Sequence, residues 1–365
     1  MRGLFINTCF TRNSPYLRFS ECMRIAQISP IAERVPPKKY GGTERVVSAL
    51  TEELVKRGHE VTLFASGDSI TKAKLESVYP RGLREAHLRD LYGVNHWTLL
   101  TLGLAYELQD DFDIIHDHIG PISLPTANIT STPVVVTMHG AFNAENRRLF
   151  QQLRSPNIVT ISQSQLYPVP NINHIGTVYN GLNMQHYPFG AVPDSYLLFV
   201  GRISMEKGTH LAIEAAQQLD MPLIIAAKLE KEDQLYFREY VEPRLSDRIK
   251  WVGEVDEEER NRLMSQAKCL LHPVTWREPF GLVIIEAMAC GCPVVGFNRG
   301  SIPELIETGV TGYVVEDIEG MIDAVNSIDT IERAVCREYA LQNFSAERMT
   351  DGYEAIYKKL LSPEI

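Results

Sequence analysis

The chain has 365 residues, of which 44% are hydrophobic and 22% charged, and its formal net charge is −10. This length is sufficient for two domains with cores of their own, and the composition is that of an ordinary globular protein. No apolar run approaches the roughly 18 residues that a membrane-spanning helix needs, so we expect no transmembrane enzyme.

The charge is unevenly spread along the chain. Residues 1–185 carry 18 Lys and Arg against 16 Asp and Glu, so the remaining residues carry a net −12. A nucleic-acid-binding protein should be basic, so we predict no nucleic-acid partner. The first half could contact an anionic acceptor or a membrane surface through clusters at 72–89 and 147–154, although scattered surface charge is the usual explanation. Six irregularly spaced cysteines predict neither a disulfide framework nor a metal site, and we interpret them as reduced thiols of a cytoplasmic protein.

Residues 1–22 show no sustained periodicity, and we predict a disordered extension upstream of Met23. A targeting or membrane-contact arm is the alternative. From Met23 onward strands and helices alternate, which is the pattern of a parallel sheet with helices on both faces. A strand at 24–29 leads through a loop to Gly41, Gly42 and a helix over 44–57. Two glycines let the backbone approach a ligand at an anion-favouring helix N-terminus, although a plain turn is the simpler interpretation.

Three histidines follow two strands of the first half. The predicted strand 112–116 ends in His116-Asp117-His118, and the strand 133–138 is followed by His139. Parallel strands present their carboxyl ends to one cleft, so we expect these histidines to open onto it. A metal site would need a third ligand nearby, and none appears, so we predict no metal. Each histidine alone is more often a hydrogen-bonded structural residue.

The second half begins again with a strand at 196–201, followed by Arg202, a short loop, Lys207-Gly208 and a helix over 209–219. Arg binds phosphate oxygens with two parallel hydrogen bonds, and Lys supplies a mobile point charge. Cations near a helix N-terminus oppose the helix dipole, which favours a bound anion over two chance surface charges. The pattern therefore predicts a diphosphate site.

The stretch Thr275–Glu304 carries two carboxylates eight positions apart. Glu278 lies in a Pro/Gly loop after an apolar run, and Glu286 lies in a helix predicted over 282–289. Ordinary helix capping is the alternative for such acids, and two carboxylates alone could also indicate a glycoside hydrolase. A hydrolase has no use for the cation pair at Arg202 and Lys207, which argues against that alternative.

These motifs resemble glycosyltransferase family 4. Its members carry a Glu, seven intervening residues and a second Glu in this setting, and the Gly-Arg and Lys-Gly pairs match as well. The resemblance covers nearly everything from Met23 onward and implies the GT-B fold, an α/β architecture of two Rossmann-like domains that face each other across a cleft. We accordingly expect an N-terminal acceptor-binding domain at 23–185, a C-terminal nucleotide-sugar domain at 186–344, and a helix at 345–365 that crosses back to the first domain.

The resemblance also implies roles for individual residues. Arg202 and Lys207 would hold the diphosphate, Glu286 would accept hydrogen bonds from the ribose, and Glu278 and His139 would contact the transferred sugar. His118 would lie on the acceptor side. The remaining candidates approach the phosphates or the sugar through their main chain: Gly41, Gly42, Gly281, Leu282 and Val283. One departure is Ser301, because many family members have two glycines before the Pro-Glu pair at 303–304.

The implied activity is transfer of a sugar from a nucleoside-diphosphate sugar, of the UDP or GDP type, to an acceptor hydroxyl with retention of configuration. No cofactor or metal is expected beyond this co-substrate, and the acceptor could be a sugar, a lipid-linked molecule or a small molecule. The local sequences Phe64–Asp68 and Phe297–Ser301 look closest to those of the bacterial branch that includes antibiotic-tailoring, avilamycin-type transferases. A nucleotide-sugar epimerase of the same fold and a non-catalytic nucleotide-sugar binding protein are the alternatives.

Overall fold

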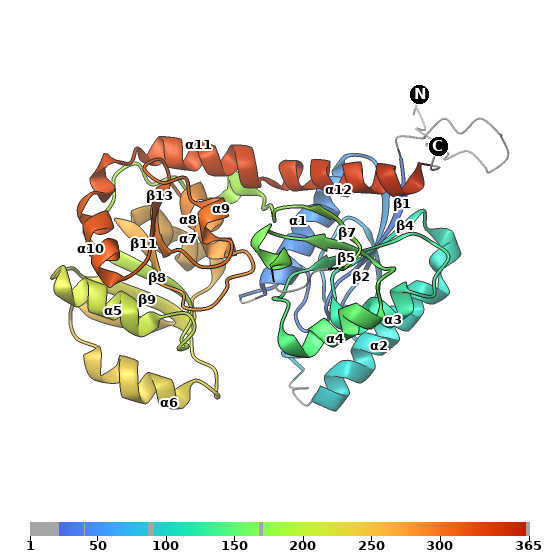
Figure 1. The fold of residues 1–365 in the computed structure, drawn as a ribbon, viewed down its shortest axis with the longest axis horizontal. Helices are drawn as coiled ribbons and strands as arrows, with labels where there is room; N and C mark the ends of the chain where they lie inside the picture. The colour runs from blue at the N-terminus through green and yellow to red at the C-terminus, as the bar shows by residue number, and fades with distance from the viewer. Residues whose placement is uncertain (1–21, 40, 87–90, 168–170, 363–365) are drawn as a thin grey trace, which may run out of the picture.

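The structure is a computed structural model that describes residues 22–39, 41–86, 91–167, 171–362. Two parallel sheets flanked by helices lie side by side, one built from each half of the chain (Figure 1). This is the α/β two-domain architecture that the strand–helix alternation predicts. The proposed extension at 1–22 falls almost wholly outside the described residues.

The first sheet has seven strands in the order β3-β2-β1-β4-β5-β6-β7, and every pairing is parallel. Its central strands are short and fully buried, because helices cover both faces. The strands are β1 (Arg24–Ile28), β2 (Glu60–Phe64), β3 (Lys74–Glu76), β4 (Ile114–Asp117), β5 (Val134–Met138), β6 (Asn157–Thr160) and β7 (His174–Thr177).

The helices of this half form two layers. Apolar side chains of α2 (Leu91–Glu107), α3 (Leu124–Ala127) and α4 (Ala144–Gln152) pack on one face of the sheet. On the other face, α1 (Gly42–Lys56) packs beside α12 (Ala346–Leu361), which comes from the far end of the chain. The expected first helix and the expected strands are present with shifts of a few residues.

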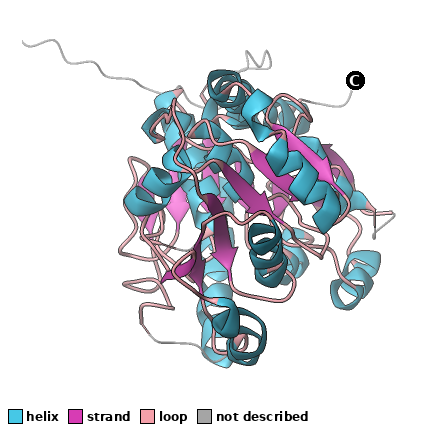
Figure 2. Cartoon of the chain, turned by 90° about the vertical axis from the view of Figure 1, so that its left-hand side faces the viewer, coloured by secondary structure: helices cyan, strands magenta, loops and turns pink. Residues whose placement is uncertain are grey.

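The second sheet has six strands in the order β10-β9-β8-β11-β12-β13, all parallel. Helices lie on both sides of it (Figure 2). The strands are β8 (Leu197–Arg202), β9 (Leu223–Lys228), β10 (Ile249–Gly253), β11 (Cys269–His272), β12 (Val294–Phe297) and β13 (Gly312–Val315). The helices are α5 (Thr209–Gln218), α6 (Gln234–Tyr236), α7 (Glu257–Gln266), α8 (Leu282–Ala289), α9 (Ile302–Leu305), α10 (Ile318–Asn326) and α11 (Arg333–Phe344).

Some elements lie in segments that have no clear hydrophobic periodicity. The polar segment 67–95 contains the edge strand β3 and the start of α2. The segment 140–156 contains α4, whose start is capped by reciprocal hydrogen bonds between Asn143 and Asn146. A three-residue strand and a nine-residue helix are too short to show a reliable hydrophobic period.

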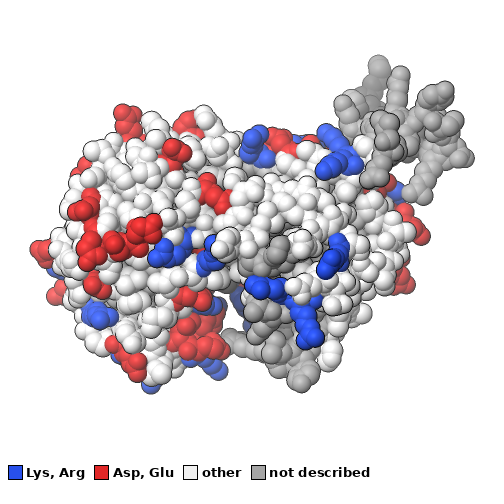
Figure 3. Space-filling view, in the orientation of Figure 1, with Lys and Arg blue, Asp and Glu red and all other residues white. Residues whose placement is uncertain are grey.

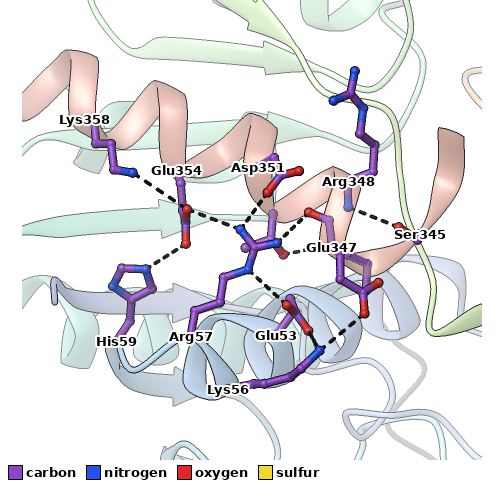
Figure 4. Close-up of polar contacts among 12 residues, drawn as sticks. Glu53, Lys56, Arg57, His59, Ser345, Glu347, Arg348, Asp351, Glu354 and Lys358 are labelled. Carbon is purple, nitrogen blue, oxygen red and sulfur yellow. Dashed lines mark hydrogen bonds and ion pairs between the residues drawn. The ribbon is translucent and has the colours of Figure 1, made fainter. Parts of the chain in front are cut away.

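Helix α12 runs from the second half of the chain onto the first sheet (Figure 1). The hydroxyl of Ser345 accepts from the amide of Arg348 at 3.2 Å, which makes Ser345 the N-cap of this helix. Along the seam with α1, the guanidinium of Arg57 donates to Glu53 of its own helix and to Asp351 and the carbonyl of Glu347 on α12 (Figure 4). His59 and Glu354 add a further contact of 3.0 Å.

No described helix is long and apolar enough to cross a membrane. Figure 3 shows acidic side chains prevailing on the left-hand half of the molecule, over the second sheet, in agreement with the charge count along the sequence.

Replacing Arg57 tests how far this seam holds the chain's end in place. In Arg57→Ala the carboxylates of Glu53 and Asp351 lose a shared partner that is only 23% exposed, so we expect the midpoint of thermal unfolding to fall by about 3–6 °C. Lys74→Ala, which breaks an exposed pair with Glu76, is the control and should leave the midpoint unchanged. Equal midpoints for both variants would show that the seam contributes nothing.

Candidate active site

A hollow between the two halves is lined by five of the eleven site residues singled out in the sequence. It is bounded by the start of α1, the ends of β8 and β9, and the starts of α7 and α8, where open parallel sheets bind ligands. Its lining residues are Lys39, Gly41, Gly42, Arg45, Val200, Gly201, Ala226, Lys228, Glu254, Val255, Arg260, Leu282, Val283 and Glu286.

Glu286 is the most heavily bonded carboxylate of this hollow. It lies on α8, is 3% exposed, and its Oε1 accepts from Arg45 at 2.6 Å and from the Tyr187 hydroxyl at 3.1 Å, with Arg260 also at 3.1 Å. Among the described residues, none donates to its other oxygen, Oε2. Arg45 belongs to α1 of the first domain, so this ion pair joins the two halves. A buried carboxylate needs such partners, since an unpaired buried charge is costly.

Glu278 is held on the neighbouring loop by two side chains. Its Oε2 accepts from Lys207 Nζ at 2.6 Å and from the indole Nε1 of Trp276 at 2.9 Å. The ammonium of Lys207 also lies 4.8 Å from the centre of the Trp276 ring, within reach of a cation–π attraction. An ammonium has three N–H donors, so Lys207 keeps donors for a further acceptor.

Arg202, the other predicted diphosphate ligand, lies at the end of β8. Its guanidinium pairs with Glu206 and lies 3.5 Å from Asp233. The predicted cations Arg202 and Lys207 are thus both in ion pairs, at the carboxyl end of the second sheet. The structure does not place Arg202, Lys207 or Glu278 in the lining of the hollow around Glu286.

Ser301 has a clear structural place despite its departure from the family pattern. Its buried hydroxyl donates to the carbonyls of Glu278 and Phe280, at 3.0 and 2.6 Å, and its amide also donates to Glu278. At Gly300, with φ of +62°, an added Cβ would lie 2.3 Å from the carbonyl oxygen of Glu278. The side chain of Ser301 therefore points inward and fixes the loop that carries Glu278.

The glycine loops of the two halves meet at the hollow. Gly41 has φ of +146°, and a Cβ there would lie 2.7 Å from Pro37, so no other residue fits easily. A Cβ on Gly42 would lie 3.2 Å from the side chain of Leu282, the first residue of α8. Gly281 precedes α8 in the left-handed conformation, with φ of +92°. The starts of α1 and α8 thus face each other.

The histidines lie at a second hollow in the first domain. His139 contacts His118 through Nε2 and Nδ1, 2.9 Å apart, and both rings line this hollow, whereas His116 is buried below them. Burial lowers the pKa of His139 to about 4, so the ring is neutral at pH 7. The other lining residues carry no charge: Pro30, Thr43, Ile119, Gly120, Pro121, Met138, Gly140, Ala141 and Asn146.

A polar bridge connects the histidine loop to the other domain. The carboxylate of Glu304 accepts from the amides of Gln163 and Ser164, both at 2.8 Å. Ser162 donates to the carbonyl of Pro279 at 2.7 Å, next to Glu278. The Gln165 amide donates to the carbonyls on either side of His139, at 2.9 Å each. Residues 162–165 therefore link the Glu278 loop to His139.

Several of these contributors were not singled out in the sequence. Arg45 follows the Gly-Gly pair in the first turn of α1, but its partner Glu286 is 241 positions away in the sequence. Trp276 lies two positions before Glu278. Glu304 was noted only as part of a Pro-Glu pair. One local signal could have pointed to a further residue of the site: Gln27 is a polar side chain in a strand that is predicted to be buried. Among the described residues, no three potential ligands of His, Cys, Asp or Glu type are grouped to hold a metal ion.

Comparison with known proteins decides the family. The model described as Glycosyltransferase Family 4 matches residues 40–186, and that described as Glycosyl transferases group 1 matches residues 190–342. The chain belongs to this glycosyltransferase family. The two matches together span all the candidate residues and every strand of the two sheets except β1.

Two curated relatives cover most of this glycosyltransferase. It is 25% identical to the N-acetyl-alpha-D-glucosaminyl L-malate synthase of Bacillus anthracis, over 88% of the chain and 94% of the relative. It is 28% identical to the glycogen synthase of Mycobacterium tuberculosis, over 84% and 86%.

Solved structures show the same GT-B fold. AviGT4, a glycosyltransferase involved in avilamycin A biosynthesis, superimposes with a TM-score of 0.71 at 23% identity, covering 94% of this chain and 99% of that one. Anabaena HepE in complex with UDP and glucose gives 0.70 at 21% identity, covering 92% and 100%. The predicted fold is confirmed, whereas the place near the avilamycin branch stays a prediction at this identity.

Glu44, behind the glycine loop of the glycosyltransferase, gives a pH-dependent prediction. Burial raises the pKa of its carboxyl from 4.5 to about 7. Between these values the unfolded chain has released the proton and the folded chain keeps it, so this group's contribution to stability is lost as the pH rises from about 4.5 to 7. Gln has no proton to lose. We expect the stability of Glu44→Gln relative to the parent to increase by roughly 3 kcal/mol between pH 4.5 and pH 8.

Urea unfolding at several pH values measures this difference. Glu60→Gln, at an exposed position of β2, provides the reference for removing a surface carboxylate. Curves of stability against pH that run parallel for Glu44→Gln and the parent would contradict the assignment.

Proposed function

We propose that this glycosyltransferase moves a sugar from a nucleoside-diphosphate sugar to an acceptor hydroxyl, with retention and without a metal ion. The observation that carries the proposal is the hydrogen bonding of the two carboxylate oxygens of Glu286. Arg45, Arg260 and Tyr187 converge on its Oε1, and Oε2 has no donor among the described residues. A carboxylate oxygen of this kind is suited to the paired hydroxyls of a ribose.

The donor would extend from this ribose toward Lys207 and Arg202. Lys207 keeps two N–H donors for a diphosphate beyond its ion pair with Glu278, and the main chain of Gly41, Gly42 and residues 281–283 adds amide donors nearby. HepE has been crystallised in complex with UDP-glucose, which supports a donor of the UDP type, and a GDP-sugar remains within the proposal. Glu278 and His139 would contact the transferred sugar.

The chemistry asks the protein to stabilise charge on the leaving diphosphate. Arg202 and Lys207 would neutralise that charge as the glycosidic bond breaks, which is the task a divalent cation performs elsewhere. Retention fits this arrangement if the acceptor attacks from the side on which the diphosphate leaves, with the leaving phosphate oxygen taking the proton of the acceptor hydroxyl. Trp276 would keep Glu278 in place when Lys207 turns toward the phosphates.

The acceptor would enter the uncharged hollow beside His118 and His139. A sugar, a lipid-linked molecule or a small molecule could supply the hydroxyl, and a cytoplasmic location with peripheral membrane contact would suit a lipid-linked one. The hollow's neutral lining favours a reacting end without charge.

A thermal-shift screen in EDTA tests the donor assignment. A ligand that binds the folded state stabilises it by about 2.7 kcal/mol at a hundredfold excess over its Kd. We expect UDP or GDP, and their sugars, to raise the unfolding temperature of the parent. Glu286→Gln and Lys207→Met should each reduce the shift to near zero, since one loses the ribose contact and the other the phosphate contact.

The matched control is Glu319→Gln, at an exposed position of α10, which should keep the full shift. No shift with any nucleotide at millimolar concentration would contradict the proposal, as would a full shift in both site variants. A shift that appears only with a divalent metal would overturn the metal-independent mechanism alone.

A further inference from the structure

A chain of buried polar side chains runs from His139 through the first sheet to α12. His139 Nε2 contacts His118 Nδ1 at 2.9 Å, and His118 Nε2 contacts the Gln27 side-chain oxygen at 2.7 Å. The Gln27 nitrogen donates to the Tyr357 hydroxyl at 3.4 Å, and that hydroxyl lies 2.6 Å from His116 Nδ1. Apart from His139, whose ring is partly exposed, all these side chains are buried.

Burial removes protonated histidines from this chain. It lowers the pKa of His116 and His118 well below the ordinary value, and that of His139 to about 4. Each ring is therefore neutral at pH 7 and carries a single N–H. Every contact must consequently join one donor to one acceptor. The side chains can therefore donate either all from His139 toward α12 or all from α12 toward His139, apart from the junction at Gln27, whose side chain has both an acceptor and a donor end.

The contact between Tyr357 and His116 selects the direction. The Gln27 nitrogen lies 3.4 Å from both His116 Nδ1 and the Tyr357 hydroxyl, and it can only donate, so both atoms accept from it. Because His116 Nδ1 is an acceptor, its 2.6 Å contact has the Tyr357 hydroxyl as donor. His116 Nδ1 is then the acceptor and its Nε2 carries the proton, which it donates to Thr137 at 2.8 Å.

This direction extends to the substrate side through Gln27. Tyr357 has given its only proton to His116, so it can only accept from Gln27, which must turn its nitrogen toward the tyrosine. The Gln27 oxygen then faces His118 and accepts from its Nε2. His118 Nδ1 is left as an acceptor, so His139 must donate through Nε2.

We propose that Gln27 is a positioning residue, which fixes His139 in the tautomer with a bare Nδ1, so that this ring accepts a hydrogen bond from a substrate hydroxyl. His139 Nδ1 has no hydrogen bond to any described residue, and the ring lines the uncharged hollow of the first domain. The opposite tautomer would present an N–H and would suit a carbonyl or phosphate oxygen instead. The identity of the hydroxyl rests on the proposed function, whereas the tautomer does not.

The tautomer can be measured directly on the full chain without donor or acceptor. In long-range ¹H–¹⁵N correlation spectra of protein labelled at histidine, protonated and bare ring nitrogens have distinct shifts, and His139→Asn identifies the signals of that ring. We expect His139 in the parent to have protonated Nε2 and bare Nδ1 in a ratio of about five to one or more, as one net hydrogen bond provides. Gln27→Leu should lower this ratio severalfold.

Two variants separate the orientation effect from a general loss of structure. Gln27→Glu keeps an oxygen toward His118 and should keep the parent tautomer, and Thr62→Val, at a buried position on the adjacent strand, should leave it unchanged. Should Gln27→Leu not fold, Tyr357→Phe removes the donor that sets the direction and should lower the ratio in its place.

A protonated Nδ1 on His139 in the parent would overturn the proposal. So would an unchanged ratio in folded Gln27→Leu, or in Tyr357→Phe if Gln27→Leu does not fold. Because these spectra need no substrate, the tautomer assignment and the proposed transferase activity can fail independently.

Discussion

The ion pair between Arg45 and Glu286 is the contact on which the geometry of the cleft depends. Glu286 is buried on a short helix of the C-terminal domain, and a carboxylate in that position needs compensating donors. One of them comes from the N-terminal domain, on the helix that follows the glycine loop. Arg45 also donates to the carbonyl of Lys39 at 3.0 Å, so the same guanidinium holds the glycine loop against the opposite domain.

Two further contacts hold the domains in this arrangement. Glu304 and the carbonyl of Pro279 bind residues 162–164, which places the loop of Glu278 against the segment that supports His139. Helix α12 lies across the first sheet and ends the polar chain from His139 with Tyr353 and Tyr357. The C-terminal part of the chain therefore supports both the loop of Glu278 and the histidines of the first domain.

The sequence was sufficient for the architecture because strand–helix alternation and glycine loops are local signals. The residue types around them were sufficient to place Glu286 on a helix and Glu278 on a loop, and α8 begins at the predicted residue, Leu282. The partners of these residues could not be predicted, since Arg45 meets Glu286 across 241 positions and His118 meets Gln27 across 91. Ser301 is instructive, because the sequence marked it only as a departure from the family pattern, whereas its side chain points into the protein and holds the loop of Glu278.

In the proposed function the nucleotide binds in the cleft between the domains, and hydrogen–deuterium exchange with UDP and GDP in EDTA tests this directly. Nucleotide bound there must slow exchange at the start of α1, over 41–46, and at the starts of α5 and α8, over 207–211 and 281–286, at the same ligand concentration. Protection of both domains with a common half-saturation point is the predicted result. Protection confined to one domain, or absent from all three segments at millimolar nucleotide, would contradict the account.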